Sequence, residues 1–145
     1  MINVLTEDID FKLKNINKIK SWIKHCVNEF KINRISINLI FCSDKYLYEI
    51  NKKYLNHDTL TDIITFDYSE KNLISGDLLI SIERVEENAK EFSNSFEAEL
   101  LRVIIHGVLH LLSYNDKTEN EKREMREKEN IYIDIYKNKM NSGKE

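Results

Sequence analysis

The chain has 145 residues, of which 41% are hydrophobic and 32% charged, and its formal net charge is −3. This is the composition of a soluble protein with a core. The acidic balance argues against a protein coated in nucleic acid, though not against a local basic face. Cys26 and Cys42 are too few and too far apart for a disulfide framework. No apolar run reaches transmembrane length and no signal-peptide pattern is present, so we expect one domain, residues 1–145, in the cytoplasm without membrane contact.

The first half of the chain alternates between strand-like and helix-like patterns. The apolar run 2–5 predicts a short strand, and apolar residues at helical spacing predict a helix over 11–30. Alternation of apolar and polar residues then predicts a half-buried strand over 35–41. Ser43 or Asp44 can cap the helix that follows.

The second half contains two more strand patterns and then mainly helices. The β-branched run 61–66 and the stretch 76–81 predict strands, with Gly76 serving the turn before the second of them. A helix is expected over 82–92, and a capping box that begins at Thr118 predicts a last, highly charged helix. Together these elements predict an α+β domain, a sheet of three or four strands covered by helices.

One face of the first predicted helix is basic. The lysines on it are Lys12, Lys14, Lys18, Lys20 and Lys24. No acidic residue interrupts this face. Two interpretations stay open: a solvated helix face, or a docking surface for phosphates on a protein that is otherwise acidic.

A long apolar run over 96–112 carries a single polar stripe. The residues of the stripe are Glu99, Arg102, His106, His110 and Ser113. They recur every three or four positions, as one face of a helix does. A helix that is apolar on nearly every other side is buried, and Asn94 with Glu97 is the expected capping pair at its start.

His106 and His110 lie one helical turn apart, close enough for both imidazoles to bind the same ion. Asp116 follows a short turn and can supply a third ligand. Three protein ligands leave a fourth position for water, which is typical of catalytic rather than structural zinc sites. We therefore predict a metal site, His106, His110 and Asp116, at the C-terminal end of the buried helix. The alternative is a pair of histidines that are hydrogen-bonded inside a core.

Gly107 follows the first histidine and has two implications. A glycine in the middle of a helix costs about 1 kcal/mol relative to alanine, so it usually has a packing or access reason. In the HExxH metallopeptidases a glutamate in this place is the general base. Its absence weakens the peptidase interpretation, and the sequence offers no other obvious general base.

Residues 106–116, HGVLHLLSYND, resemble the HGxLHLxGYDH signature of the YbeY family of bacterial metal-dependent endoribonucleases. Residues 51–66 and 76–81 resemble two further segments of that family, with order and spacing kept. The resemblance implies a zinc-bound hydrolase that cuts single-stranded RNA. It further implies a role in maturation of the 3′ end of small-subunit ribosomal RNA and in ribosome quality control, with ribosomal RNA and the ribosome as partners.

The chain departs from the signature at several positions. Asp116 stands at the place of the third histidine ligand. A carboxylate leaves the ion less positive than an imidazole would. We therefore expect a less acidic bound water and better tolerance of harder ions such as Mn²⁺. Leu55 replaces an arginine, and if that arginine grips phosphate, Lys53 or His57 can substitute as RNA-binding residues. Ser113 replaces a glycine, which we interpret as a local turn adjustment.

Three functions therefore remain in play. The leading one is a metallo-endoribonuclease, in which either activated water or the 2′-hydroxyl of the RNA attacks the phosphodiester. The second is a metal-dependent hydrolase of another class, such as a peptidase. The third is a ribosome-associated RNA-binding factor whose metal is structural.

Overall fold

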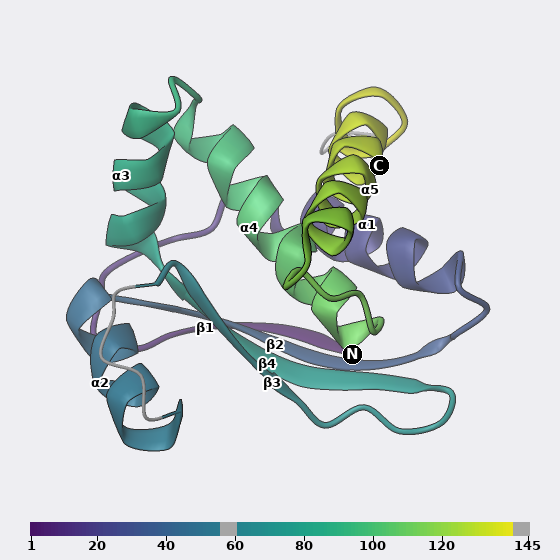
Figure 1. Cartoon of the computed structure of the whole chain (residues 1–145), viewed down its shortest axis with the longest axis horizontal. Helices are drawn as coiled ribbons and strands as arrows, with labels where there is room; N and C mark the ends of the chain where they lie inside the picture. The colour runs from purple at the N-terminus through teal and green to yellow at the C-terminus, as the bar shows by residue number, and fades with distance from the viewer. Residues whose placement is uncertain (56–60, 141–145) are drawn as a thin grey trace.

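The computed structural model describes residues 1–55 and 61–140, and in these residues one mixed sheet is covered by helices (Figure 1). The strands are β1 (Ile2–Thr6), β2 (Arg34–Cys42), β3 (Ile63–Asp67) and β4 (Leu73–Ser81). The helices are α1 (Ile16–Asn28), α2 (Asp44–Leu55), α3 (Ile82–Glu91), α4 (Phe96–Leu111) and α5 (Glu119–Asn138). The order of the strands in the sheet is β1-β2-β4-β3. The strands are parallel except for β3, which pairs antiparallel with β4. The predicted α+β class and the four-stranded limit of the sheet are confirmed.

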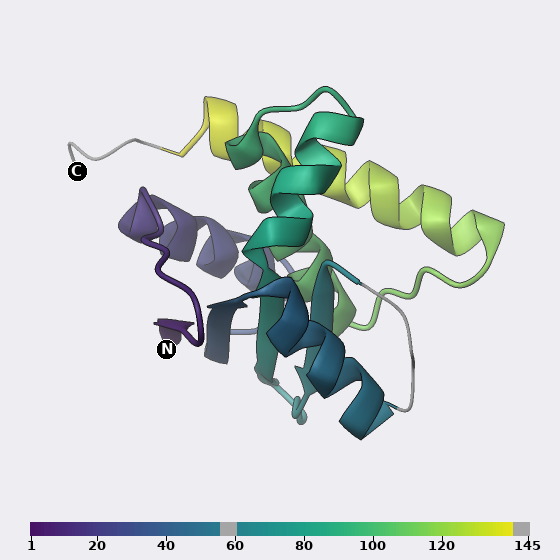
Figure 2. The same ribbon diagram turned by 90° about the vertical axis from the view of Figure 1, so that its left-hand side faces the viewer.

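The helices lie on both faces of the sheet, but unequally. Figures 1 and 2 show α1, α3, α4 and α5 on one face and α2 on the other. In β2, Ile37 and Leu39 point to the large helical layer, while Ile40 and Cys42 pack with α2. This alternation follows from the two-residue period of a strand. The end of β2 is therefore buried on both faces, not on one as the sequence pattern suggested.

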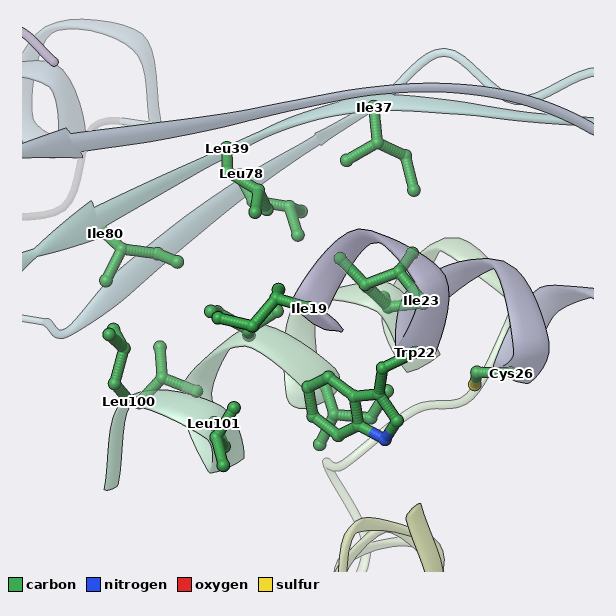
Figure 3. Packing of buried hydrophobic residues seen from close by; sticks show 14 of the residues in the cluster. Ile19, Trp22, Ile23, Cys26, Ile37, Leu39, Leu78, Ile80, Leu100 and Leu101 are labelled. Atoms are coloured by element: carbon green, nitrogen blue, oxygen red, sulfur yellow. The ribbon is translucent and has the colours of Figure 1, made fainter. Parts of the chain in front are cut away.

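The main core lies between the sheet and the large helical layer (Figure 3). Ile37 and Leu78 point from the sheet toward Ile19 on α1 and Leu101 on α4. Trp22 is fully buried, and its indole N–H donates a hydrogen bond of 2.7 Å to the carbonyl of Tyr132 on α5. A fully buried apolar side chain contributes about 1.5–3 kcal/mol, and the hydrogen bond of Trp22 ties α1 to α5.

The first helix begins later than its apolar pattern predicted. Asn15 has φ 60°, in the left-handed region, and α1 starts only after it, at Ile16. A left-handed residue cannot continue a right-handed helix. Phe11 and Leu13 still pack against the core, but from a segment that is not helical. Their burial explains why they extended the helical pattern.

Gly76 does not serve a turn, as we had expected from the sequence; it lies inside β4, opposite Ile37 of β2. A Cβ placed there would lie 2.6 Å from the carbonyl oxygen of Phe66 and 2.7 Å from a methyl of Leu111. Both distances are too short for real contacts. The glycine thus lets the last turn of α4 lie directly on the sheet.

Helix α4 is buried and begins at a different cap from the predicted one. Ser95, not Asn94, is the N-cap: its hydroxyl accepts a hydrogen bond of 3.0 Å from the Ala98 amide. Asn94 instead donates to Glu99, at 3.3 Å. Gly107 has the expected packing reason, since a Cβ there would lie 2.8 Å from a methyl of Ile63.

The chain reverses direction directly after α4. Ser113 adopts φ 79°, and the Tyr114 amide donates back to the carbonyl of Leu109 at 3.0 Å. The predicted capping box then starts α5: the hydroxyl of Thr118 accepts from the Glu121 amide, and Glu121 accepts from the Thr118 amide. This turn returns the chain to the last turns of α4. None of the described helices is long and apolar enough to cross a membrane.

Candidate metal centre

The turn after α4 brings Asp116 back against both histidines. The Nε2 atoms of His106 and His110 lie 3.1 Å apart. The Oδ2 atom of Asp116 lies 3.3 Å from Nε2 of His106 and 3.5 Å from Nε2 of His110. The three predicted residues therefore form one cluster at the end of a buried helix.

The spacing of these three atoms fits a tetrahedral zinc ion. Zinc binds imidazole nitrogen and carboxylate oxygen at about 2.0–2.1 Å, and tetrahedral angles then place any two donor atoms about 3.3–3.4 Å apart. The three measured separations lie on either side of that value. Without an ion, two imidazole nitrogens and a carboxylate oxygen at these distances need protons between them.

The outer nitrogens of both rings are held by other groups. Nδ1 of His110 lies 3.0 Å from the carbonyl oxygen of Tyr114, which accepts only, so the proton of a neutral ring sits on Nδ1. Nδ1 of His106 lies 2.7 Å from Oε2 of Glu129 on α5. Both contacts leave Nε2 with a free lone pair directed at the centre of the cluster, the arrangement found behind zinc-bound histidines.

Glu129 is a functional residue that the sequence interpretation missed. It is only 5% exposed, and its second oxygen accepts a hydrogen bond of 2.8 Å from Arg102, whose other nitrogen donates to Asn130. Burial alone would raise the pKa of Glu129, but the hydrogen bonds from His106 and Arg102 outweigh it and lower the pKa. A signal existed: Glu129 lies four residues from Met125 and from Ile133, so a carboxylate stands in the apolar stripe of α5.

The same carboxylates act on His106. Its burial alone would lower the pKa of the imidazole, but the hydrogen bond and charge of Glu129, with Asp116 and Asp62 adding, raise the pKa above its ordinary value. The negative groups around the cluster therefore favour a positive charge at this place. The same carboxylates that stabilise a proton on His106 would stabilise a divalent metal ion bound there.

The cluster lies where two hollows meet. One hollow, of 510 Å³, opens between α3, α4 and α5; the other, of 650 Å³, opens between α2 and β3. The residues that line both are Asp62, Ile63, His106 and Asp116. Each hollow has the volume of a small-ligand site. Together they form one groove that runs past the cluster, and we name its two halves the α5 arm and the α2 arm.

Asp62 is the second residue that the sequence interpretation did not single out. It stands just before β3, and its backbone carbonyl accepts from the Ser81 amide at 3.0 Å. Its side chain accepts a 3.4 Å hydrogen bond from Asn88, and burial raises the pKa of Asp62, with the charge of His106 opposing that rise. A carboxyl group beside the cluster that is not one of the three clustered donors is suited to proton transfer.

Of the two residues proposed to replace the family's arginine, Lys53 does not line the groove. Lys53 is exposed on the last turn of α2, with its Nζ 5.2 Å from the ring centre of Tyr54, whereas Asn51 and Leu55 of the same turn line the α2 arm. His57 lies outside the described residues. The structure thus brings together the three proposed metal ligands but not Lys53.

The lysines of the predicted basic face do not all belong to the first helix, since Lys12 and Lys14 precede α1, and all of them lie away from the groove. Lys12 and Lys14 line a separate hollow at the other end of α4, beside Phe96. Lys18 covers the ring of Tyr136, with Nζ 4.2 Å from its centre. None of the lysines of this face contributes to the described lining of either arm.

Sequence comparison places this chain in one family. A family model described as Endoribonuclease YbeY matches residues 1–137. The chain belongs to the YbeY endoribonuclease family. Membership confirms the resemblance seen at residues 106–116 and the predicted enzyme class, a nuclease that hydrolyses RNA.

Individual relatives cover nearly the whole chain. A protein of Amoebophilus asiaticus named Endoribonuclease YbeY is 52% identical over 134 residues, covering 91% of this chain and 90% of its own. A protein of the same name from Flavobacterium johnsoniae is 48% identical over 136 residues, covering 94% and 97%. The solution structure of a Thermotoga maritima protein superposes with a TM-score of 0.71 at 34% identity, covering 94% of this chain and 89% of that one.

Proposed function

We propose that this YbeY-family chain is a zinc-dependent endoribonuclease that cuts single-stranded RNA at the His106, His110 and Asp116 cluster. The observation that carries the proposal is the triangle of donor atoms, 3.1, 3.3 and 3.5 Å on its sides, at the point where both arms of the groove meet. A structural metal needs no open groove beside it, whereas a catalytic one does.

The chain's own groups divide the work in this proposal. A bound zinc ion would supply Lewis-acid polarisation of a phosphoryl oxygen and acidification of water. Glu129 and the carbonyl of Tyr114 hold the two imidazoles with Nε2 toward the centre. Asp62 lies where it can take the proton of the attacking group, whether that group is water or the 2′-hydroxyl.

The biological role that we propose follows the family resemblance. It is maturation of the 3′ end of small-subunit ribosomal RNA and ribosome quality control, in the cytoplasm, with the ribosome as partner. An open groove suits an extended single strand better than a folded helix of RNA.

A second candidate function is a ribosome-associated RNA-binding factor with a structural metal. The observation that favours it concerns the lysines of α1, Lys18, Lys20 and Lys24, which lie outside the groove and therefore have no part in cleavage. Lys20→Glu with Lys24→Glu should weaken ribosome binding and flatten its salt dependence. Unchanged binding would identify the face as an ordinary solvated surface.

The deciding experiment for the proposed function is cleavage of a labelled single-stranded RNA by three samples with their metal content recorded. The samples are metal-stripped protein, zinc-reloaded protein, and the His110→Ala variant treated with zinc in the same way. Cleavage by the reloaded wild type alone supports the metalloenzyme. Equal cleavage by all three would identify a contaminating nuclease, and no cleavage by a wild type that holds one ion would favour the binding factor.

A further inference from the structure

We infer that the α5 arm of the groove holds the RNA strand beside the cluster, with Lys122 and Arg126 binding phosphates and Phe92 stacking on an unpaired base. This inference rests on the proposed function and assigns the substrate contacts that it leaves open. The residues that bind the phosphates of the RNA have to be identified because Leu55, an apolar side chain, lines the groove where the family's segment carries an arginine.

The two arms differ in charge. The α5 arm is lined by the cations Arg102, Lys122 and Arg126. The α2 arm is lined by Asp67 in addition to the two aspartates that the arms share, and no lysine or arginine lines it in the described part of the chain. A polyanionic strand that reaches the cluster is therefore attracted along the α5 arm.

Two of the three cations are available to a ligand. Arg102 is committed to Glu129 and Asn130 at 2.8 and 2.9 Å. Lys122 and Arg126 have side chains that are 58% and 63% exposed, and their ion pairs with Glu119 and Glu129 are long, at 3.8 and 4.0 Å. They stand four residues apart, so they project side by side from one face of α5.

The carboxylates of the same arm do not cancel these two charges. Glu99 is buried and accepts from Asn94, and Glu129 is engaged by Arg102 and His106. Asp116 belongs to the cluster, and Asp62 lies where the two arms meet, away from the α5 side. The side of the arm formed by α5 therefore offers net positive charge to a strand that passes along it.

Phe92 lies at the end of α3, across the arm from α5. Figure 1 shows α3 and α5 on either side of α4, and the hollow between them is lined by Phe92 together with Lys122 and Arg126. The ring is 60% exposed, and a phenylalanine offers only its π face. Aromatic stacking accepts any base but requires that the base be unpaired, so Phe92 would favour single strands without reading sequence.

The phosphate part of this inference is tested by RNA binding, which does not depend on cleavage. We would titrate zinc-loaded protein with a short, fully 2′-O-methylated single strand, check by gel that it stays intact, and follow fluorescence anisotropy over a range of salt. Lys122→Ala with Arg126→Ala should weaken binding and lower the salt slope by about 1.4, about 0.7 for each lost phosphate contact. The matched control removes Lys137 and Lys139, which are exposed at the far end of α5, and should leave both unchanged.

The proposed stacking of a base on Phe92 is tested by separate variants and by a fluorescence signal from the RNA. Phe92→Ala should weaken binding by roughly 5- to 100-fold, and Phe92→Trp should restore it. The fluorescence of 2-aminopurine in the RNA should be quenched by the wild type and not by Phe92→Ala. Tyr68→Ala removes an aromatic ring of similar exposure, 57%, that does not line either arm, and serves as the control.

The outcomes separate this inference from the proposed function. If the wild type binds and cuts RNA but the α5 pair and its control behave alike, or Phe92→Ala still quenches 2-aminopurine, the assignment of the α5 arm is wrong and the proposed function stands. If the wild type binds RNA through the α5 arm but does not cut it, the arm assignment stands and the cleavage proposal fails. Failure of the wild type to bind single-stranded RNA would overturn both.

Discussion

His106 on α4 and Glu129 on α5 share a hydrogen bond of 2.7 Å between Nδ1 and Oε2, and this bond ties the proposed metal ligand to a helix that supplies no ligand itself. The carboxylate is held from its other side by Arg102. The orientation of one ligand ring is thereby set by packing between two helices. A loss of that packing should be measurable as a loss of metal affinity.

Glu129→Gln should weaken zinc binding by about 10- to 100-fold, because the amide keeps the shape of the side chain but removes the charge behind His106. Competition with a chromophoric zinc chelator measures this directly. Glu127→Gln, on the exposed side of the same helix, is the control and should bind as the wild type does. Equal affinity of all three proteins would show that Glu129 supports only the fold.

Asp116→His should shift the metal preference toward zinc, because three neutral imidazoles leave the ion more positive than two imidazoles and a carboxylate do. We expect the ratio of cleavage with Mn²⁺ to cleavage with Zn²⁺ to fall relative to the wild type. The cleavage rate with zinc should reach half of its maximum at a lower pH, since the bound water becomes more acidic. A wild type that is inactive with every ion except zinc would contradict the role given to this carboxylate.

Asp62→Asn should lower the cleavage rate by about 10²- to 10⁴-fold, the usual contribution of a general base, with zinc content unchanged. The amide occupies the same space and can still accept from Asn88. Asp67→Asn, which changes a carboxylate farther along the α2 arm, is the comparison. If both variants lose activity to the same small degree, Asp62 acts through general electrostatics and not by taking a proton.

Ser113→Gly should stabilise the protein by about 1 kcal/mol, because Ser113 has φ 79° and a Cβ is strained in that region. The family signature has glycine at this place. Chemical denaturation measures the change in the free energy of unfolding. Ser113→Ala keeps the Cβ and should show no gain, so a gain of the same size in both variants would contradict the backbone explanation.

The stability of the protein should fall above about pH 9 because of Cys26. Burial raises the pKa of this thiol from 9.0 to about 12. A raised pKa in the folded state means that the stabilisation is complete below the unfolded pKa and is lost as pH rises toward the folded one. Between about pH 8 and about pH 10, Cys26 alone should cost about 1.4 kcal/mol. Cys26→Ala should start less stable but lose less over this interval, and an identical decline would rule out the thiol as the cause.

The cluster was predictable from sequence because all of its donors lie within 106–116. A helix fixes the spacing of His106 and His110, and a turn is the shortest way to return Asp116 to them. Glu129 lies 23 residues from His106 in sequence, and its role depends on how α5 crosses α4. No pattern of neighbouring residues in the sequence predicts how these two helices cross.

Two of the three errors in the predicted elements have the same origin. Gly76 was assigned to a turn because glycine is common there, but its reason is the approach of Leu111 from a helix far along the chain. Asn94 and Ser95 are both good caps, and only the backbone geometry of Ser95 decides between them. Phe11 and Leu13 are apolar because they pack against the core, although the segment that contains them is not helical. For Gly76 and for Phe11 and Leu13, tertiary contacts overrode a local preference.

The proposed ligands come from one short stretch of chain, while α2, α3, β3 and α5 supply the walls of the groove that lie outside α4. The reactive centre and the surface that selects its substrate are thus encoded separately. A wall residue can be exchanged, as with leucine at position 55, without moving any of the donor atoms. Related proteins that descend from such a chain can keep the same chemistry while they change which RNA strands they bind.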